Sequence, residues 1–313
     1  MDASRSARRA QMLRRHLAPE MKMASQQVSA NATSSAADAA EQEKDVILYE
    51  VIDGGVCVLT LNRPTRLNSL TNEMQALYFD MLDKAAADER VRVIVVTGAG
   101  RAFCAGAEME LLKTIGSKDR QPAGMTARRS LQQSQATRIP KPIIAAINGP
   151  AAGLGFVLAM HTDVRFATKG AKFTSAFAKR GLVAEHGSSF MLPRIAGVSN
   201  ALDVLLSSRV FLGDEAKDLG LVTRVYEDKD ALMKATLEYA REMAKMCSPA
   251  SMAAMKRQVY EHLDRDQDTS YDESDQLMTR SFKHPDSKEG VASYVEKRDP
   301  DFQGLKAGYI HDK

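Results

Sequence analysis

The amino-acid sequence predicts an α/β fold with mostly parallel strands and a mainly helical C-terminal third. Between residues 46 and 167, apolar β-branched runs alternate with segments whose apolar residues recur every three or four positions. This alternation is typical of parallel strands joined by helices. The run Val91–Val96 is apolar at nearly every position, as expected of a strand that is covered on both faces. From Ala201 onward helical patterns dominate.

The first predicted elements are a hairpin and an amphipathic helix. Val46–Val51 and Val56–Leu61 are strand patterns separated by two glycines, which tolerate the positive φ of a tight turn. Two antiparallel strands are therefore expected. Thr71 can cap the helix that follows. The apolar residues on the helix face expected to pack against the core are Met74, Leu77, Tyr78, Met81, Leu82 and Ala85.

The strand, turn and helix pattern then repeats loosely. Ile143–Ile147 is a buried strand pattern, a glycine-rich turn follows, and a helix is expected from about Gly153 to Met160. Val164–Ala167 is the next strand pattern. Cys247-Ser248-Pro249 is expected to begin a long helix.

Composition and charge exclude several classes of protein. The 313 residues are 44% apolar and 27% charged, which excludes a collagenous, disulfide-framed or wholly disordered chain. Lys and Arg total 43 against 40 Asp and Glu, with no basic stretch interleaved with aromatic residues, so no nucleic-acid partner is expected. The three cysteines form no metal-ligand pattern, and no metal site is expected. The uncharged run Pro142–Met160 is interrupted by Gly and Pro, so no stable membrane insertion is expected.

Residues 1–42 differ from the rest of the chain. They are rich in Arg and Ser and poor in acidic residues, as in a mitochondrial transit segment. We predict a disordered targeting segment that directs the protein to the mitochondrial matrix. The spacing of Arg9 and His16-Leu17 also resembles an N-terminal peroxisomal signal. A further alternative is a basic tail that carries no targeting signal.

Two short turns are candidates for binding an anion. Phe103–Ala107 and Asn148–Gly155 each follow a strand pattern, contain small residues and precede a helical pattern. Small residues allow close approach of the backbone, and free N–H groups there lie near the positive end of a helix. Two such turns side by side could direct two N–H groups at one oxygen. Each turn taken alone is more often a tight packing turn.

Three separated motifs in this sequence resemble the enoyl-CoA hydratase/isomerase family, the crotonase superfamily. They are IVVTGAGRAFCAGA from Ile94 to Ala107, IIAAINGPAAGLGFVLAMHTD from Ile143 to Asp163, and DSKEGVASYVEKRDPDF from Asp286 to Phe302. The resemblance implies a crotonase-like spiral of ββα units over residues 43–245 and a helical trimerisation region over 246–313. It also implies an acyl-CoA thioester as ligand, no cofactor apart from the CoA of the substrate, and a homotrimer or a dimer of trimers.

The resemblance also implies roles for individual residues. The N–H groups of Ala105 and Leu154 fall at the two oxyanion-donor positions of the family, with Leu154 replacing a common glycine. Arg66 and Leu67 match the stretch that contacts the nucleotide and pantetheine end of CoA. Phe282 and Lys283 match an aromatic residue and a base presented to CoA near a subunit contact. The other predicted substrate-binding residues are Phe103, Gly106, Ala107, Gly153, Phe156, Val157, Phe177 and His186.

The acidic residues decide which reaction is predicted. Hydratases of the family resemble one another in having two catalytic glutamates. At the matching positions this sequence has Val157 and Phe177, so both acids are absent. Glu185 instead occupies the position where Δ3,Δ2-enoyl-CoA isomerases of the family place a single catalytic acid. The prediction is therefore an enzyme that moves a double bond from C3 to C2 of an unsaturated fatty enoyl-CoA, with Glu185 as base.

Alternative interpretations remain at this point. One is a 2-enoyl-CoA hydratase that works with Glu185 alone, and another is a protein that binds acyl-CoA without catalysis. Glu185 itself could be only an exposed turn acid near the start of a helix, where the helix dipole favours negative charge.

Overall fold

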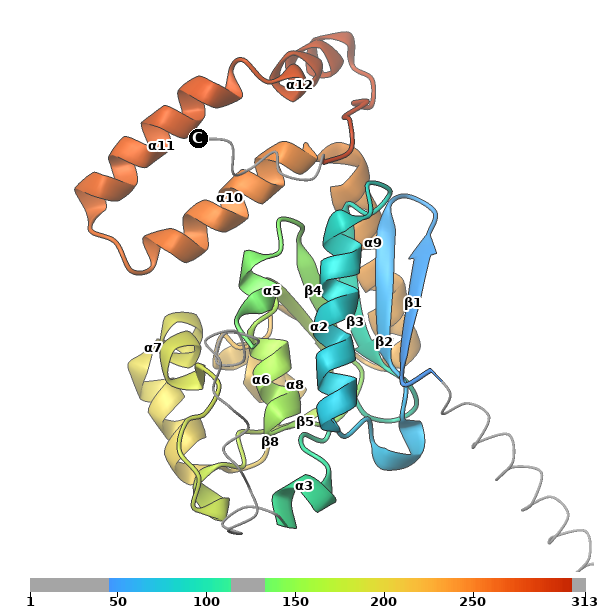
Figure 1. Ribbon diagram of the computed structural model, residues 1–313, viewed down its shortest axis with the longest axis vertical. Coiled ribbons are helices and arrows are strands. Elements are labelled where there is room, and N and C mark those ends of the chain that lie inside the picture. Colours follow the sequence, from blue (N-terminus) through green and yellow to red (C-terminus); the bar gives the residue numbers. More distant parts are fainter. Residues whose placement is uncertain (1–44, 114–132, 306–313) are drawn as a thin grey trace, which may run out of the picture. The chain divides into compact units, whose positions relative to one another are not determined.

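The computed structural model describes residues 45–113 and 133–305 (Figure 1). The chain divides into two units between Asp45 and Val46, and the second unit contains the elements described below. The predicted targeting segment 1–42 lies outside the described residues.

The hairpin and the capped helix were predicted correctly. Strands β1 (Ile47–Ile52) and β2 (Val56–Leu61) pair antiparallel around a turn with Gly54 and Gly55 at φ of 88° and 76°. Helix α2 (Asn72–Ala87) begins after Thr71, whose side chain accepts a hydrogen bond from the Met74 N–H at 3.1 Å. Of the residues predicted to face the core, Leu77 and Met81 are partly buried and the other four are buried.

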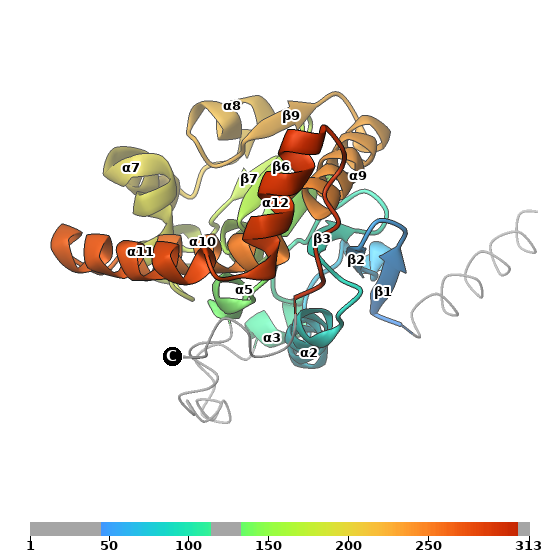
Figure 2. The same cartoon turned by 90° about the horizontal axis from the view of Figure 1, so that it is seen from above.

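A six-stranded sheet carries the fold. Its order is β1-β2-β3-β4-β6-β9, and every pair after the hairpin is parallel. Seen from above, β1, β2, β3, β6 and β9 follow one another across the molecule (Figure 2). The strand predicted over Val91–Val96 lies two residues later. The Val91 N–H is bound in a turn to the Asp88 carbonyl, and the pairing with β2 begins at Val93. The other strands of the sheet are β3 (Val93–Gly98), β4 (Ile143–Ile147), β6 (Val164–Thr168) and β9 (Arg224–Tyr226).

Helices cover both faces of this sheet. One core cluster joins α2 and α6 (Leu154–Met160) to one face, and a second joins α9 (Lys229–Met246) to the other. Side chains alternate across a strand, so successive residues of β3 belong to different clusters. Ile94 and Val96 face α2, whereas Val93 and Val95 face α9.

A second, small sheet was not predicted from the sequence. It has the order β5-β7-β8, with β5 parallel and β8 antiparallel to β7. Its strands have only two or three residues each, too few to produce a hydrophobic period. They are β5 (Ala151–Ala152), β7 (Lys172–Thr174) and β8 (Phe211–Leu212).

The C-terminal third is mainly helical, as predicted. Helix α10 (Pro249–His262) begins after Ser248, whose hydroxyl caps the N–H of Ser251. It packs against α11 (Gln267–Ser281) through an ion pair between Arg257 and Glu273, and α12 (Pro285–Glu296) follows. The remaining elements are η1 (Pro64–Arg66), α3 (Met109–Lys113), α5 (Gln135–Arg138), η2 (Ala178–Arg180), α7 (Ser188–Ser207) and α8 (Gly213–Asp218).

Candidate active site

The two candidate turns lie side by side. They follow β3 and β4, and the carboxyl ends of neighbouring parallel strands meet at the same edge of a sheet. Cys104 and Ala151 form an isolated parallel bridge, in which the Cys104 N–H donates to the Pro150 carbonyl and the Ala152 N–H donates to the Cys104 carbonyl, both at 3.0 Å. Backbone hydrogen bonds thus hold the two turns together directly.

Glycines at two positions make this close approach possible. A Cβ atom on Gly155 would lie 2.1 Å from the Cys104 carbonyl oxygen, and one on Gly106 would lie 2.6 Å from the Ala152 oxygen. Gly106 also has a φ of 99°, which L side chains rarely adopt. The same Cβ position on Gly106 is 3.5 Å from the Leu154 nitrogen, so the first turn lies against the beginning of α6.

Two buried amides that sequence analysis did not single out support the first turn. Asn68 donates to the carbonyls of Ala99 and Ala102 at 2.9 and 2.8 Å. Asn148 accepts from the Gly98 N–H at 3.1 Å and donates to the Gly100 carbonyl at 3.1 Å. An Asn beside small residues at the end of a strand is a weak sequence signal, because these partners are 31 to 50 residues away along the chain.

The predicted pair of oxyanion donors needs one correction. The Ala105 N–H donates to the Leu67 carbonyl at 3.0 Å, so it is already used within the fold. In the described part of the chain, the N–H groups of Ala107 and Leu154 have no hydrogen-bond acceptor. Leu154 is the first residue of α6, where an N–H has no intrahelical partner. The free N–H groups on the adjoining turns are therefore those of Ala107 and Leu154. Gly153, which precedes Leu154, has a φ of 51°.

Three predicted substrate contacts are packing residues instead. The side chains of Phe103, Phe156 and Val157 have no exposed surface, and the first two belong to the main core cluster. In the described structure these three side chains are therefore packed inside the protein. Phe177, which precedes η2, is 5% exposed. The two positions where hydratases of the family place acids therefore carry buried apolar side chains.

Glu185 lies in the turn that leads into α7. Its carbonyl accepts hydrogen bonds from the backbone N–H of Ser188, at 3.0 Å, and from the Ser188 hydroxyl. Its carboxylate is 3.6 Å from the Nε2 atom of His186, and 36% of the Glu185 side chain is exposed. The carboxylate is thus half-buried beside an imidazole.

His186 is neutral near pH 7 in this position. Burial lowers the pKa of its imidazole, and the nearby Glu185 carboxylate opposes this shift only in part. The residue has a φ of 54° and is followed by Gly187 at 78°, so the turn presents the imidazole without continuing into helix. His186 and Gly187 line a cavity, whereas Glu185 is not among the described residues that line it.

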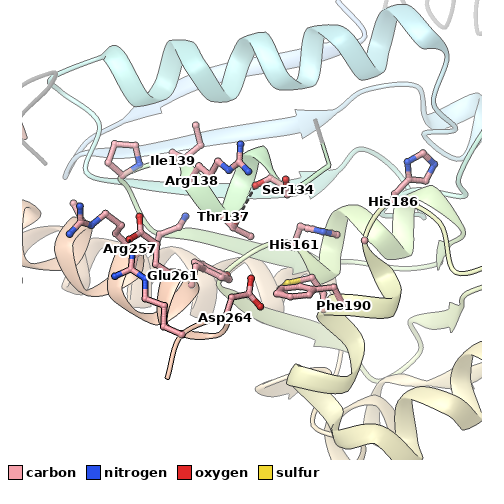
Figure 3. A pocket seen from close by; sticks show the side chains of 17 residues that line it. Ser134, Thr137, Arg138, Ile139, His161, His186, Phe190, Arg257, Glu261 and Asp264 are labelled. Carbon is pink, nitrogen blue, oxygen red and sulfur yellow. Dashed lines mark hydrogen bonds and ion pairs between the residues drawn. The ribbon is translucent and has the colours of Figure 1, made fainter. Parts of the chain in front are cut away.

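This cavity has a volume of about 910 Å³ and lies between α5, the end of α6, the start of α7 and α10 (Figure 3). Apolar side chains from Ile139, Phe190 and Met191 form part of its wall. Polar and charged side chains from α5 and α10 form much of the rest. Its size is typical of a small-molecule pocket.

The predicted CoA-contacting residues are only partly brought together. Arg66 is exposed at the end of η1, and the carbonyl of the next residue, Leu67, binds the N–H of Ala105. Arg66 therefore lies beside the first turn. Phe282 is 65% exposed and Lys283 is exposed at the end of α11, which lies at the opposite end of this unit from α3 and β5 (Figure 1).

The thiol of Cys104 lies in the first turn and is fully buried. Burial raises the pKa of the Cys104 thiol to about 12, so this thiol is protonated at neutral pH and is a poor nucleophile. Within residues 45–113 and 133–305, no three His, Cys, Asp or Glu side chains are grouped as a metal site. No helix in these ranges is long and apolar enough to cross a membrane.

Comparisons with known proteins agree with this geometry. A family model described as Enoyl-CoA hydratase/isomerase matches residues 51–305. A 1,2-epoxyphenylacetyl-CoA isomerase of Escherichia coli K12 is 32% identical over 255 residues, covering 81% of this chain and 97% of the relative. A probable peroxisomal enoyl-CoA hydratase 1 of Arabidopsis thaliana is 38% identical over 192 residues, covering 61% of this chain and 71% of the relative.

Solved structures show the same fold. A putative enoyl-CoA hydratase from Streptomyces coelicolor has a TM-score of 0.76 and 28% identity, covering 83% of this chain and 94% of that chain. The parallel sheet, the paired turns and the helical C-terminal region thus define a crotonase-type fold. The chain belongs to the enoyl-CoA hydratase/isomerase family. It is an acyl-CoA enzyme, and enzymes of this family need no cofactor beyond the CoA thioester.

Proposed function

We propose that this enzyme moves a double bond from C3 to C2 of an unsaturated enoyl-CoA, with Glu185 as the only acid–base group. The observation that carries the proposal is the combination of one half-buried carboxylate, Glu185, with buried apolar side chains at positions 157 and 177. Adding water to a double bond requires groups that bind and activate the water. Moving a proton between two carbons requires one base that first takes the proton and then returns it.

The free donors on the two turns would bind the thioester oxygen. The substrate carbonyl would accept hydrogen bonds from the N–H groups of Ala107 and Leu154. Glu185 would remove a proton from C2, and the electron pair of that C–H bond would form a dienolate whose negative charge lies largely on the bound oxygen. The same carboxyl group would return the proton to C4, and the double bond would then lie between C2 and C3.

Preorganised donors explain why the α-proton becomes acidic enough to remove. Each oxyanion-hole donor typically contributes about 2.7 to 4 kcal/mol to the stability of the developing charge. Gly106 and Gly155 hold the two donors in place before the substrate arrives, so little reorganisation is needed during the reaction. His186, neutral and 3.6 Å from Glu185, leaves the carboxylate free to act as a base.

The names of relatives support two activities. The E. coli relative is named an isomerase that acts on a CoA ester. Other relatives are named enoyl-CoA hydratases, including EchA19 of Mycobacterium tuberculosis, which is 32% identical over 251 residues. Hydration with Glu185 alone is therefore the second candidate.

Two substrates distinguish these activities. Purified enzyme would be incubated separately with 3-hexenoyl-CoA and crotonyl-CoA, and the products separated by mass spectrometry. We expect conversion of 3-hexenoyl-CoA to 2-hexenoyl-CoA and little water addition to crotonyl-CoA. Rapid hydration of crotonyl-CoA without isomerisation of the other ester would contradict the proposal. Binding of both esters without turnover of either would instead favour a non-catalytic acyl-CoA protein.

We also propose that the chain assembles as a homotrimer or a dimer of trimers. Several large apolar side chains of the C-terminal helices are exposed in the single chain, among them Val259 at 63%, Tyr294 at 85% and Val295 at 71%. Such a group of exposed apolar residues is typical of a protein interface. Sedimentation velocity would give the mass in solution, and a monomer at micromolar concentration would refute the proposal.

We further propose that residues 1–42 direct the protein to the mitochondrial matrix, with the peroxisome as the alternative. The basic, acid-poor composition of this segment supports targeting to the mitochondrial matrix. The name of the Arabidopsis relative is compatible with the peroxisome. Imaging of full-length protein tagged at its C-terminus would distinguish the two. A diffuse distribution that is unchanged by deletion of residues 1–42 would exclude both.

A further inference from the structure

A hydrogen-bonded chain of backbone groups leads to the free N–H of Ala107. The carbonyl of Gly106 and the N–H of Ala107 belong to one peptide unit, in which the two groups point in opposite directions because the peptide bond is trans. The Gly106 carbonyl accepts a hydrogen bond from the Leu70 N–H at 2.7 Å. This hydrogen bond therefore sets the direction in which the Ala107 N–H points, which is away from Leu70.

The same relation holds one step further back along the chain of hydrogen bonds. The Leu70 N–H shares its peptide unit with the Ser69 carbonyl, which accepts a hydrogen bond from the Nη1 atom of Arg63 at 2.8 Å. The chain thus begins at the Arg63 guanidinium and passes through the peptide unit of residues 69 and 70 to that of residues 106 and 107. All its donors point the same way, and the last of them is the N–H of Ala107.

Contacts on several sides hold Arg63 in place at the beginning of this chain. Its Nη2 atom lies 3.0 Å from the Oε1 atom of Glu108, and the two side chains are 12% and 23% exposed. Its backbone N–H donates to the Oδ1 atom of Asn68 at 2.8 Å. The Glu108 N–H in turn donates to the Leu70 carbonyl at 3.0 Å. The residue that follows Ala107 is therefore bound both to Arg63 and to the segment that Arg63 supports.

A cation at the beginning of such a chain strengthens its last donor. Hydrogen bonds in a chain polarise one another, and they do so more strongly in a partly buried site than in water. Donation from the positive guanidinium to the Ser69 carbonyl makes the Leu70 N–H more positive, and the effect passes on to the Ala107 N–H. Negative charge develops on the thioester oxygen in the proposed reaction, so a more positive N–H there stabilises the transition state more than the bound substrate.

We propose that Arg63 is a positioning residue for the reaction. Its guanidinium orients and polarises the Ala107 N–H through the two peptide units, and Glu108 holds the guanidinium in place. The inference rests on the proposed binding of the thioester oxygen to the N–H groups of Ala107 and Leu154. It adds a charged side chain that acts on this oxygen only through the backbone.

The carbonyl stretching band of a bound thioester measures this effect without requiring turnover. A hydrogen bond to a carbonyl group weakens the C=O bond and lowers the frequency of its band. Infrared difference spectra would be recorded for octanoyl-CoA that is isotopically labelled at the thioester carbonyl. With the wild-type protein we expect a lower frequency than in water. With Arg63→Met, whose side chain cannot donate a hydrogen bond, we expect a smaller downshift.

Turnover and affinity separate positioning from a purely structural role. In folded Arg63→Met, kcat for 3-hexenoyl-CoA should fall about 10- to 100-fold, because the donor is weakened and misdirected. The affinity for octanoyl-CoA should stay nearly unchanged. Arg63→Lys should give an intermediate band and an intermediate kcat. Its ammonium group keeps the charge but cannot reproduce the forked contact with Ser69 and Glu108.

Arg209→Met is the matched control. Arg209 is also partly buried in ion pairs, at 2.6 Å from Asp203 and at 2.6 Å from Glu215, and its hydrogen bonds among the described residues do not lead to either turn. Its replacement removes the same guanidinium group and should leave the band and kcat unchanged. An equal loss in this control would overturn the inference.

The remaining outcomes distinguish failure of this inference from failure of the proposed function. A wild-type band that does not move from its position in water would refute the oxyanion site itself. A normal wild-type downshift that is fully retained in folded Arg63→Met would refute only the role of Arg63. Reduced stability of this variant with an unchanged band and kcat would show a purely structural ion pair. If Arg63→Met did not fold, an unchanged band and kcat in Arg63→Lys would overturn the inference.

Discussion

The ammonium group of Lys256 on α10 lies 2.7 Å from the Oδ2 atom of Asp163, between α6 and β6, although the two side chains are only 7% and 17% exposed. Asp163 also accepts hydrogen bonds from the Ile143 N–H at 2.7 Å and from the Tyr260 hydroxyl at 2.9 Å. This carboxylate therefore joins α10 to the beginning of β4, and its partners Lys256 and Tyr260 line the cavity.

Breaking this pair should destabilise the fold strongly. Asp163→Asn leaves the Lys256 ammonium buried without a counter-charge, and loss of one partner of a buried pair typically costs about 3 to 5 kcal/mol. The control is Asp299→Asn, whose carboxylate pairs with Lys245 where the two side chains are 60% and 59% exposed, and which should cost less than about 1 kcal/mol. Urea denaturation gives both free energies of unfolding, and similar losses in the two variants would contradict this account.

Replacing the proposed base should remove catalysis and leave binding nearly unchanged. Glu185→Gln keeps the size and polarity of the side chain but cannot accept the C2 proton, so turnover of 3-hexenoyl-CoA should fall by about 10²- to 10⁴-fold. Glu227→Gln changes an exposed carboxylate paired with Lys169 and should retain full activity. Stopped-flow rates together with calorimetric affinity for octanoyl-CoA measure both effects. Retained turnover in Glu185→Gln would remove this residue from the mechanism.

A methyl group between the two turns should disable the oxyanion site. In Gly155→Ala the new Cβ would lie 2.1 Å from the Cys104 carbonyl oxygen, so the turns must separate. We expect a loss of about 1 to 3 kcal/mol in stability and a large loss of activity. Gly170→Ala is the matched control, because no atom lies within 4 Å of its added Cβ. Activity of Gly155→Ala close to that of the wild type would show that the adjoining turns are not the site.

The buried His161 should make stability depend on pH. Burial lowers the pKa of this imidazole below the ordinary value of 6.5, so the unfolded chain binds a proton that the folded chain excludes. Below about pH 6.5 the free energy of unfolding should therefore fall as the pH falls, until the lower pKa of the folded state is reached. His161→Asn should reduce this slope. An NMR titration that gives the His161 ring a pKa of 6.5 or higher in the native protein would contradict the prediction.

Local residue patterns were enough to predict the secondary-structure elements and the class of fold. The hairpin followed from Gly54 and Gly55, the start of α2 from Thr71, and the start of α10 from Ser248. Each depends on residues within a few positions of one another, so spacing and residue type were sufficient. The three family motifs were likewise local stretches, and they led to the correct family.

Which backbone groups are free to bind a ligand depends on contacts between distant parts of the chain. Ala105 and Ala107 look alike in the sequence, but the N–H of Ala105 is bound to Leu67, 38 residues earlier, and that of Ala107 is not. The burial of Phe103 and the pairing of the two turns through Cys104 and Ala151 also depend on distant partners. A sequence pattern reports neighbours along the chain, whereas hydrogen bonds and burial depend on which distant segments come together in space.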